Sequence, residues 1–390
     1  MNNFCTDIGT LSLNKFGEVI CGDTVEVVEN DNGETIIVLT DGLGSGVKAS
    51  ILSILTAKII STMMAASMDI EECVSTVVAT LPVCKVRNIA YSTFTIIRIL
   101  DNEEAEIIQY DNPHVIFMRG GHVLDLKETS IEIDGKKIYK SRVSLIENDT
   151  FVAFSDGVVH AGVGKTLSFG WHRKDIINYL ERKYSPKLTA KTLATILVDS
   201  CNELYTQEPG DDTTACVVKI RARKRVNLLI GPPAQSDELD YMMSTFFSCE
   251  GKHIVCGGTT STLAAQYLQR PLKATLKYID PDIPPIAHIE GVDVVTEGIV
   301  TMSRVLFYAK DYLQDNKHYR NWTISQDGAS LIARLLFEEA TDIKFFVGRA
   351  VNSAHQNPDL PIGFSIKMRL IEELSEAMKQ MGKRIEVSYF

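Results

Sequence analysis

The first 220 residues alternate short apolar runs with polar turns. Two runs, 17–30 and 34–40, are joined by the sequence NDNG, and an Asn-Gly turn between apolar runs predicts a β-hairpin. Helical periodicity predicts helices at 45–66, 69–81, 173–183 and 188–204. Further strands are predicted at 91–100, 104–111, 114–121, 129–146 (a hairpin turned at Asp134-Gly135), 150–157 and 213–220. Successive strands with helices kept apart favour antiparallel sheets, and we expect an αββα sandwich with outer helices.

A basic run, RARKR (221–225), interrupts this pattern. It is either a domain junction or the solvated end of a strand. After it, strands alternate with helices, which favours a mostly parallel α/β domain. The expected strands lie within 226–234, 252–258, 272–280, 342–350 and 384–390, and the expected helices at 237–249, 259–270, 298–314, 324–340 and 365–382. We therefore predict an α/β protein of two domains, 1–222 and 223–390.

Composition narrows the class of protein. Of the 390 residues, 45% are hydrophobic and 23% are charged, so globular cores are expected. The net charge of −10 argues against nucleic acid as a partner, because nucleic-acid binding needs a basic surface. Eight cysteines without a C-x-x-C pair indicate reduced thiols. With neither a signal peptide nor an uninterrupted apolar run of about 18 residues, we expect a cytoplasmic protein without membrane association.

Carboxylates stand at the ends of several predicted strands. Asp41 and Asp156 each follow an apolar strand and precede a glycine, Asp23 lies in the first hairpin, and Asp211 and Asp212 open the last strand of the first domain. A single Asp-Gly is most often only a turn. Several carboxylates that converged would repel one another, and hard divalent cations would compensate them. An all-oxygen ligand set suits Mg²⁺ or Mn²⁺ better than zinc.

Three stretches carry a family resemblance: CGDTVEVVENDNGETIIVLTDGLGSGVKAS, AFSDGVVHAGVG and GDDTTACVVKI. In order and spacing they resemble the core motifs of the metal-dependent, type 2C-like protein phosphatases, in the branch of the bacterial stage II sporulation protein E. The resemblance covers about residues 5–221. It implies the αββα fold and hydrolysis of phosphoserine or phosphothreonine by water activated between two Mn²⁺ or Mg²⁺ ions.

The resemblance also implies roles for individual residues. Asp41 bridges the two ions, Asp23 and the Gly42 carbonyl complete one site, and Asp156 and Asp211 complete the other. Asp212 matches the second acidic residue of the last motif and is a weaker ligand candidate. The implied partner is a phosphorylated protein of the anti-sigma-antagonist kind, and homodimerisation is left open.

The sequence departs from the family at two places. Eukaryotic members often carry a histidine after the Asp-Gly, where this chain has Leu43, so the general acid is unassigned. No phosphate-binding arginine stands out: Lys48, Arg87 and Arg173 are candidates, each also explicable as a solvated charge. The stretch around His114 matches a motif of bacterial relatives only loosely.

The second domain carries one weaker signal. A predicted strand runs into Gly-Gly-Thr-Thr at a helix start, where free N–H groups and hydroxyls of Thr259, Thr260 and Ser261 could bind an anion. These residues also serve as ordinary helix caps. We therefore predict a phosphatase whose second domain is a regulatory sensor or docking domain. The alternatives are a non-catalytic scaffold whose second domain binds an anion or nucleotide, and, last, an enzyme in the second domain.

Overall fold

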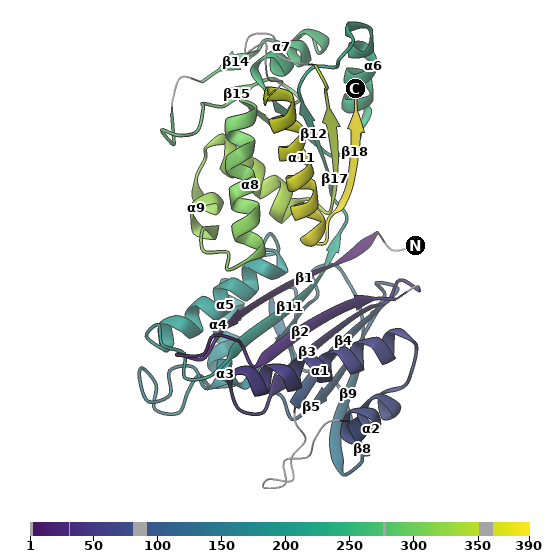
Figure 1. The fold of residues 1–390 in the computed structure, drawn as a ribbon, viewed down its shortest axis with the longest axis vertical. Coiled ribbons are helices and arrows are strands. Elements are labelled where there is room, and N and C mark those ends of the chain that lie inside the picture. The colour runs from purple at the N-terminus through teal and green to yellow at the C-terminus, as the bar shows by residue number, and fades with distance from the viewer. Residues whose placement is uncertain (1–2, 31, 81–91, 276–277, 351–361) are drawn as a thin grey trace. The chain divides into compact units, whose positions relative to one another are not determined.

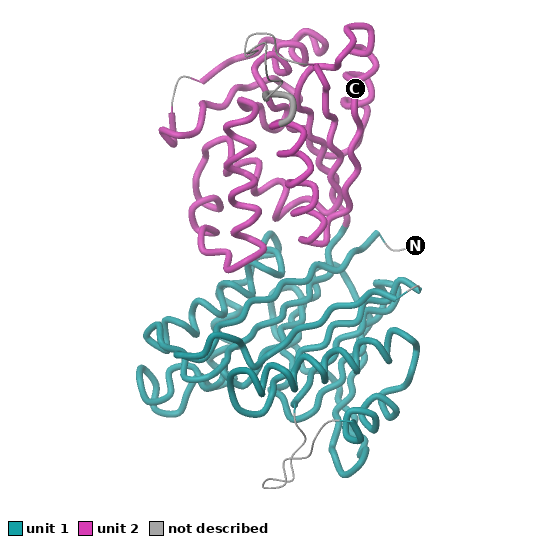
Figure 2. Tube along the Cα trace, viewed as in Figure 1, with its two compact units in different colours: residues 1–222 teal, residues 223–390 magenta. Residues whose placement is uncertain are grey.

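The computed structural model describes residues 3–30, 32–80, 92–275, 278–350 and 362–390. These residues form two compact units, 1–222 and 223–390 (Figure 2). Within the described residues, each unit has its own hydrophobic cores.

The first unit contains two antiparallel sheets (Figure 1). One has the strand order β1-β11-β10-β6-β7, and the other has the order β2-β3-β4-β5-β9-β8. The strand bounds are β1 Phe4–Leu13, β2 Asp23–Glu29, β3 Thr35–Gly42, β4 Ser92–Leu100, β5 Glu104–Tyr110, β6 Ile116–Arg119, β7 His122–Leu124, β8 Glu128–Ile133, β9 Lys136–Ser144, β10 Thr150–Phe154 and β11 Thr213–Ala222.

Helices cover the outer faces of both sheets. Helix α1 (Gly46–Ala65) packs on β2 and β3 beside α2 (Ile70–Thr80), whereas α5 (Ala190–Leu204) packs on β1 and β11 beside α4 (Arg173–Lys183). A short helix, α3 (Asp156–Val159), follows β10. Alternate strand residues such as Leu39, Phe151 and Val218 fill the space between the sheets. The αββα sandwich expected from the order of strands and helices is therefore confirmed.

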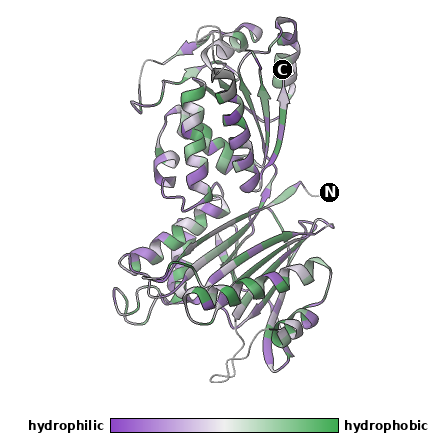
Figure 3. Ribbon diagram, viewed as in Figure 1, coloured by the Kyte–Doolittle hydropathy of each residue, from purple (hydrophilic) through white to green (hydrophobic). Residues whose placement is uncertain are grey.

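Helix α1 is apolar on both faces. Its inner face is buried on the sheet, but Val47, Ile51, Ile54 and Leu55 on the outer side are 44–60% exposed. Figure 3 shows the hydrophobic colouring along α1. Within the described residues, α1 is the one helix whose length and composition would suffice to cross a membrane, a test that core helices also pass. The expected absence of membrane association stays a prediction.

The second unit is built on a seven-stranded sheet with the order β14-β15-β16-β13-β12-β17-β18. Strands β16, β13, β12, β17 and β18 run parallel, while β14 and β15 are short and antiparallel. The bounds are β12 Arg225–Ile230, β13 Lys252–Cys256, β14 Lys273–Ala274, β15 Ala287–His288, β16 Val294–Thr296, β17 Asp342–Val347 and β18 Arg384–Tyr389. The mostly parallel sheet predicted for this half is confirmed.

Helices lie on both faces of this sheet, so its central strands are buried on both sides. They are η1 Ser236–Glu238, α6 Leu239–Ser248, α7 Gly258–Tyr267, α8 Ile299–Leu313, α9 Tyr319–Ile324, α10 Gly328–Ala333 and α11 Ile362–Gln380. Helix α10 continues as a π-helical segment, η2, over Arg334–Glu339. The single helix predicted over 324–340 is thus divided, with its start shifted to the Asp327 cap that accepts a hydrogen bond from Ser330 N.

Candidate metal centre

The hairpin β2–β3 brings two carboxylates to one end of its sheet. Asp23 opens β2 and lies opposite Asp41 near the end of β3. Gly42 follows, and a Cβ at this position would lie 2.1 Å from the Ala49 carbonyl oxygen of α1. Only glycine therefore lets α1 pack this closely against the strand end that carries Asp41.

The other sheet delivers three more carboxylates to the same place. Asp156 opens α3 directly after β10, and Asp211 and Asp212 precede β11. The register of the antiparallel pair β10–β11 fixes these positions relative to each other. An added Cβ on Gly22 would lie 2.8 Å from Asp212 Oδ2, so the β11 side reaches the start of β2.

Ser155 joins the two sheets at this end. Its hydroxyl donates to Asp23 Oδ2 (2.7 Å) and accepts from the Thr214 backbone N–H (2.9 Å). Asp212 is held separately, because its Oδ1 accepts from the backbone N–H of Lys15 (3.0 Å). These bonds fix the orientation of carboxylates that come from distant parts of the chain.

The electrostatics of the cluster show how close the carboxylates are. Burial raises the pKa of Asp41 to about 9 together with the charges of Asp23, Asp156 and Asp211 and a hydrogen bond with Asp156. Burial also raises the pKa of Asp23 to about 7, although hydrogen bonds from Ser155 and Thr214 act in the opposite direction. Burial and then the Asp156 charge raise the pKa of Asp211. The bare cluster therefore holds protons that cations could replace.

Two carboxylate oxygens of the cluster have no hydrogen-bond partner. Asp23 Oδ1 and Asp212 Oδ2 are buried and unpaired, and the two residues are 7% and 4% exposed. A buried, unpaired carboxylate oxygen is costly unless a cation compensates it. The donors are all oxygen, which suits hard divalent cations such as Mg²⁺ or Mn²⁺. The residues present thus fit the metals that the sequence predicts.

The carboxylates do not yet form a metal-coordination geometry. In the described parts of the chain, no three His, Cys, Asp or Glu side chains are already arranged to hold one ion. Mutual repulsion accounts for this, because like charges without a counter-charge turn apart or bind protons. The backbone positions and the two unpaired buried oxygens are the stronger observations.

Other predicted residues lie outside the cluster. Arg173 donates to the carbonyl oxygens of His114 and Val115, which gives it a structural use instead of the predicted contact with phosphate. Lys48 is exposed on the first turn of α1, and Arg87 lies outside the described residues. His114 contacts Glu128 Oε1 at 2.7 Å, which explains its position without a catalytic role.

The candidate anion site in the second unit is largely engaged in internal bonds. Thr260 Oγ1 accepts from Gly231 N (3.1 Å), and Ser261 Oγ donates to the Gly257 carbonyl (2.8 Å). Thr259 alone is exposed at the start of α7. The hydroxyls of Thr260 and Ser261 thus hold the loops together at the carboxyl ends of β12 and β13. Anion binding there stays a prediction.

The sequence reasoning assigned no role to three neighbours of the cluster. Ser155 directly precedes the Asp156-Gly157 pair, and this position in the motif is the sequence signal that could have identified it. Cys21 lies beside Asp23, but burial and then the Asp23 charge raise the pKa of its thiol to about 12, so it is no nucleophile. His160 Nε2 lies 3.8 Å from Asp156 Oδ2, and the i, i+4 spacing was its signal.

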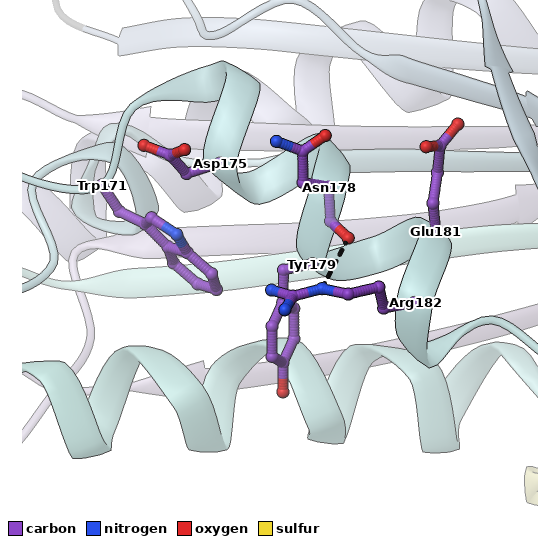
Figure 4. A pocket seen from close by; sticks show the side chains of 6 residues that line it. All are labelled: Trp171, Asp175, Asn178, Tyr179, Glu181 and Arg182. Carbon is purple, nitrogen blue, oxygen red and sulfur yellow. Dashed lines mark hydrogen bonds between the residues drawn. The ribbon is translucent and has the colours of Figure 1, made fainter.

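A surface groove of about 580 Å³ lies along α4 (Figure 4). Trp171, Tyr179 and Arg182 line it together with Asp175, Asn178 and Glu181. The backbone N–H of Trp171 donates to the carbonyl of Val159 at the end of α3 (2.8 Å). None of the six lining residues belongs to the carboxylate cluster.

Comparisons with known proteins concern the first unit. Residues 31–221, just under half of the chain, match the family model for stage II sporulation protein E, SpoIIE. The phosphatase domain of Bacillus subtilis SpoIIE is 18% identical with a TM-score of 0.44, over 57% of this chain and 95% of that one. The RsbU and RsbW domains of a Mycobacterium tuberculosis protein are 15% identical with a TM-score of 0.48, over 62% and 68%.

RsbX in complex with magnesium is 20% identical with a TM-score of 0.38, over 55% of this chain and 95% of that one. No curated protein sequence matches this chain. The family assignment depends on the family model, whose range includes Asp41, Asp156 and Asp211. Over residues 31–221 the chain is therefore similar to the stage II sporulation protein E family, in the PP2C-type group of protein phosphatases.

Proposed function

We propose that the first unit hydrolyses phosphoserine or phosphothreonine on a regulatory protein in bacterial signalling, with two Mn²⁺ or Mg²⁺ ions as cofactors. One observation carries the proposal. Five aspartates from two sheets converge in a SpoIIE-type domain, and two of their buried oxygens have no partner.

The residues divide between two ions as follows. Asp41 would be the shared ligand, Asp23 and the Gly42 carbonyl would hold one ion, and Asp156 and Asp211 would hold the other. Asp212 is the weaker candidate, because Lys15 N already occupies its Oδ1. When bound, such ions screen the phosphate dianion and lower the pKa of a coordinated water.

The protein itself positions the carboxylate ligands and supplies their negative charge. Asp41 lies between Asp23 across the hairpin and Asp156 from the other sheet, so it is suited to be shared. Ser155 orients Asp23, which leaves Asp23 Oδ1 for a cation. Because the Cys21 thiol stays protonated, we expect hydrolysis without a covalent thiol intermediate.

The partner we propose is a phosphorylated anti-sigma-antagonist-like protein in the cytoplasm. The second unit would serve as a sensor or docking module for this reaction. A non-catalytic scaffold is the weaker alternative, since a scaffold has no need of five convergent aspartates at the cost of their repulsion.

The experiment is phosphate release from a phosphoserine protein by the full chain, with and without Mn²⁺. Asp41→Asn should lower kcat/KM by at least about 100-fold, the upper end of what even indirect changes at metal sites cost. The matched control is Asp125→Asn, an exposed aspartate of the same unit that lies outside the cluster.

The control variant should retain wild-type activity. Chelation should abolish release, and Mn²⁺ or Mg²⁺ should restore it. Phosphate release that persists both in Asp41→Asn and under chelation would rule out the proposed function.

A further inference from the structure

His160 borders the carboxylate cluster from the side of α3. It follows that short helix, four residues after Asp156, and its Nε2 lies 3.8 Å from Asp156 Oδ2. The two side chains are 56% and 49% exposed, so both are open to solvent at the rim of the cluster. Residues four apart on a helical turn share one face, which explains the approach.

The Asp156 carboxylate has neighbours on two sides. It is within hydrogen-bond reach of Asp41, whereas its Oδ2 faces the His160 ring. An ion held by Asp41 and Asp156 would therefore lie next to the imidazole. This places His160 beside the outer of the two proposed metal positions.

The distance between these donors is close to what shared coordination requires. Donors at about 2.1 Å from an octahedral ion lie roughly 3 Å apart. Side-chain rotation at two half-exposed residues can close the remaining gap from 3.8 Å. Pairs of ligands at i and i+4 on one helical face are an established way of holding a metal.

The imidazole would contribute differently from a sixth carboxylate. A neutral ring nitrogen adds a donor without adding negative charge to a cluster that already holds five carboxylates. Nitrogen donors also favour transition ions, whereas Mg²⁺ prefers oxygen.

We propose that His160 donates a ring nitrogen to the metal ion on the Asp156 side and thereby makes this site select Mn²⁺ over Mg²⁺. The inference rests on the proposed function, because it presupposes a cation between Asp41 and Asp156. It assigns His160 to metal selectivity and leaves the protonation of the leaving group unassigned.

Two other uses of His160 make different predictions. An imidazolium that only neutralises Asp156 would compete with cations, so its removal would strengthen the binding of both ions. A histidine that contacts only the substrate phosphate would leave metal affinity unchanged and would affect KM.

The test measures Mn²⁺ and Mg²⁺ affinities of the full-length wild type, His160→Ala and His122→Ala. His122 is the matched control, since its side chain is 83% exposed on β7 and its contact is with Glu181. We expect His160→Ala to weaken Mn²⁺ binding about 10-fold or more and Mg²⁺ binding less than about 3-fold. His122→Ala should change neither affinity.

Pulsed EPR on bound Mn²⁺ supplies a second readout independent of activity. The wild type and His122→Ala should show a ¹⁴N coupling from an imidazole, and His160→Ala should lose it. Unchanged or tighter Mn²⁺ binding in His160→Ala, or no ¹⁴N coupling in the wild type, would overturn the inference. Phosphate release in the same samples separates the two claims: if it persists with Mn²⁺, only the role of His160 fails, and if Mn²⁺ neither binds nor activates, both fail.

Discussion

Individual carboxylates of the cluster destabilise the fold when no metal is bound. Asp41 and Asp23 are buried beside other carboxylates, and their pKa values are raised to about 9 and about 7. A buried group that prefers its neutral form is a common feature of functional sites. The same repulsion that opposes folding favours cation binding, because each bound cation relieves it.

The first prediction concerns pH. An acid whose pKa is higher in the folded than in the unfolded state binds protons more tightly when folded, so stability falls as pH rises. With chelator present, the free energy of unfolding of the wild type should fall between pH 5 and pH 8. Urea unfolding at each pH measures it, and Asp41→Asn should reduce the fall by roughly 1 to 3 kcal/mol.

Added Mn²⁺ should stabilise the wild type more at pH 8 than at pH 5, since fewer protons then compete for the carboxylates. Equal slopes of stability against pH for the wild type and Asp41→Asn would contradict the raised pKa of Asp41.

The second prediction concerns Ser155 as a positioning residue. Ser155→Ala removes the bonds to Asp23 Oδ2 and Thr214 N, and buried groups left without partners cost about 1 to 3 kcal/mol. Mn²⁺ affinity, measured by EPR titration, should fall about 10- to 100-fold because Asp23 loses its orientation. Ser168→Ala, at an exposed serine, is the control and should change neither quantity. An unchanged Mn²⁺ affinity in Ser155→Ala would refute the positioning role.

At the scale of elements, the contact between β3 and α1 shapes the site. The carbonyl oxygen of Ala49 approaches the Gly42 Cα so closely that a Cβ would lie 2.1 Å away. Helix α1 is therefore held against the strand end that carries Asp41. The apolar outer face of α1, with Ile51 and Ile54 about half exposed, begins at this same contact.

The third prediction tests this contact. Gly42→Ala should lower the free energy of unfolding by about 1 to 3 kcal/mol or more, because the helix must shift to admit the methyl group. Thermal or urea unfolding provides the measurement. Gly258→Ala is the control, since its Cβ would lie in ordinary contact distance, 3.4 Å, from Glu297 Oε1, and its effect should stay within about 0.5 kcal/mol. Equal effects of the two substitutions would contradict the close approach.

Most elements of the first unit could be predicted because their signals are local. The helix over 173–183 has its predicted bounds, and the hairpin turned at Asp134-Gly135 is present. Strand β1 was not predicted, because it lies at a sheet edge and few of its residues are buried. The strand predicted within 272–280 is present only as the two residues of β14, and helix α9 and strand β15 are too short to produce a periodic pattern. The π-helical segment after α10 depends on tertiary packing that periodicity does not report.

The five aspartates of the site could be located from sequence because strand ends and glycines mark them. Their convergence could not, since it depends on which strands of two sheets face each other. Ser155 was missed because its partner, Asp23, is brought to it only by the fold. The i, i+4 spacing of Asp156 and His160 can be read from the sequence, but the approach of Asp41 to Asp156 is defined by the fold. In the second unit, Thr260 and Ser261 looked available, but the fold engages their hydroxyls.

At the scale of the whole molecule, the chain consists of two units with separate cores. Domains with their own cores often unfold as separate cooperative units. The proposed metal ligands all belong to residues 1–222, so cations should stabilise that unit alone.

The fourth prediction follows from this division. Calorimetry of the full chain should resolve two transitions, and Mn²⁺ should raise the temperature of only one. At a free concentration 100 times its Kd, a ligand adds about 2.7 kcal/mol to the unit that binds it. Asp41→Asn should largely remove the shift, whereas Asp125→Asn should keep it. If Mn²⁺ raised the temperature of one transition only, and Asp41→Asn left that transition unaffected, the metal site would lie elsewhere.

The most direct measurement is anomalous diffraction at the manganese edge from crystals of the full chain grown with Mn²⁺. The account predicts two peaks among Asp23, Asp41, Asp156 and Asp211, about 3.5–4 Å apart, with an Asp41 oxygen between them. Data that show no peak among these four residues, or peaks only elsewhere on the chain, would contradict it.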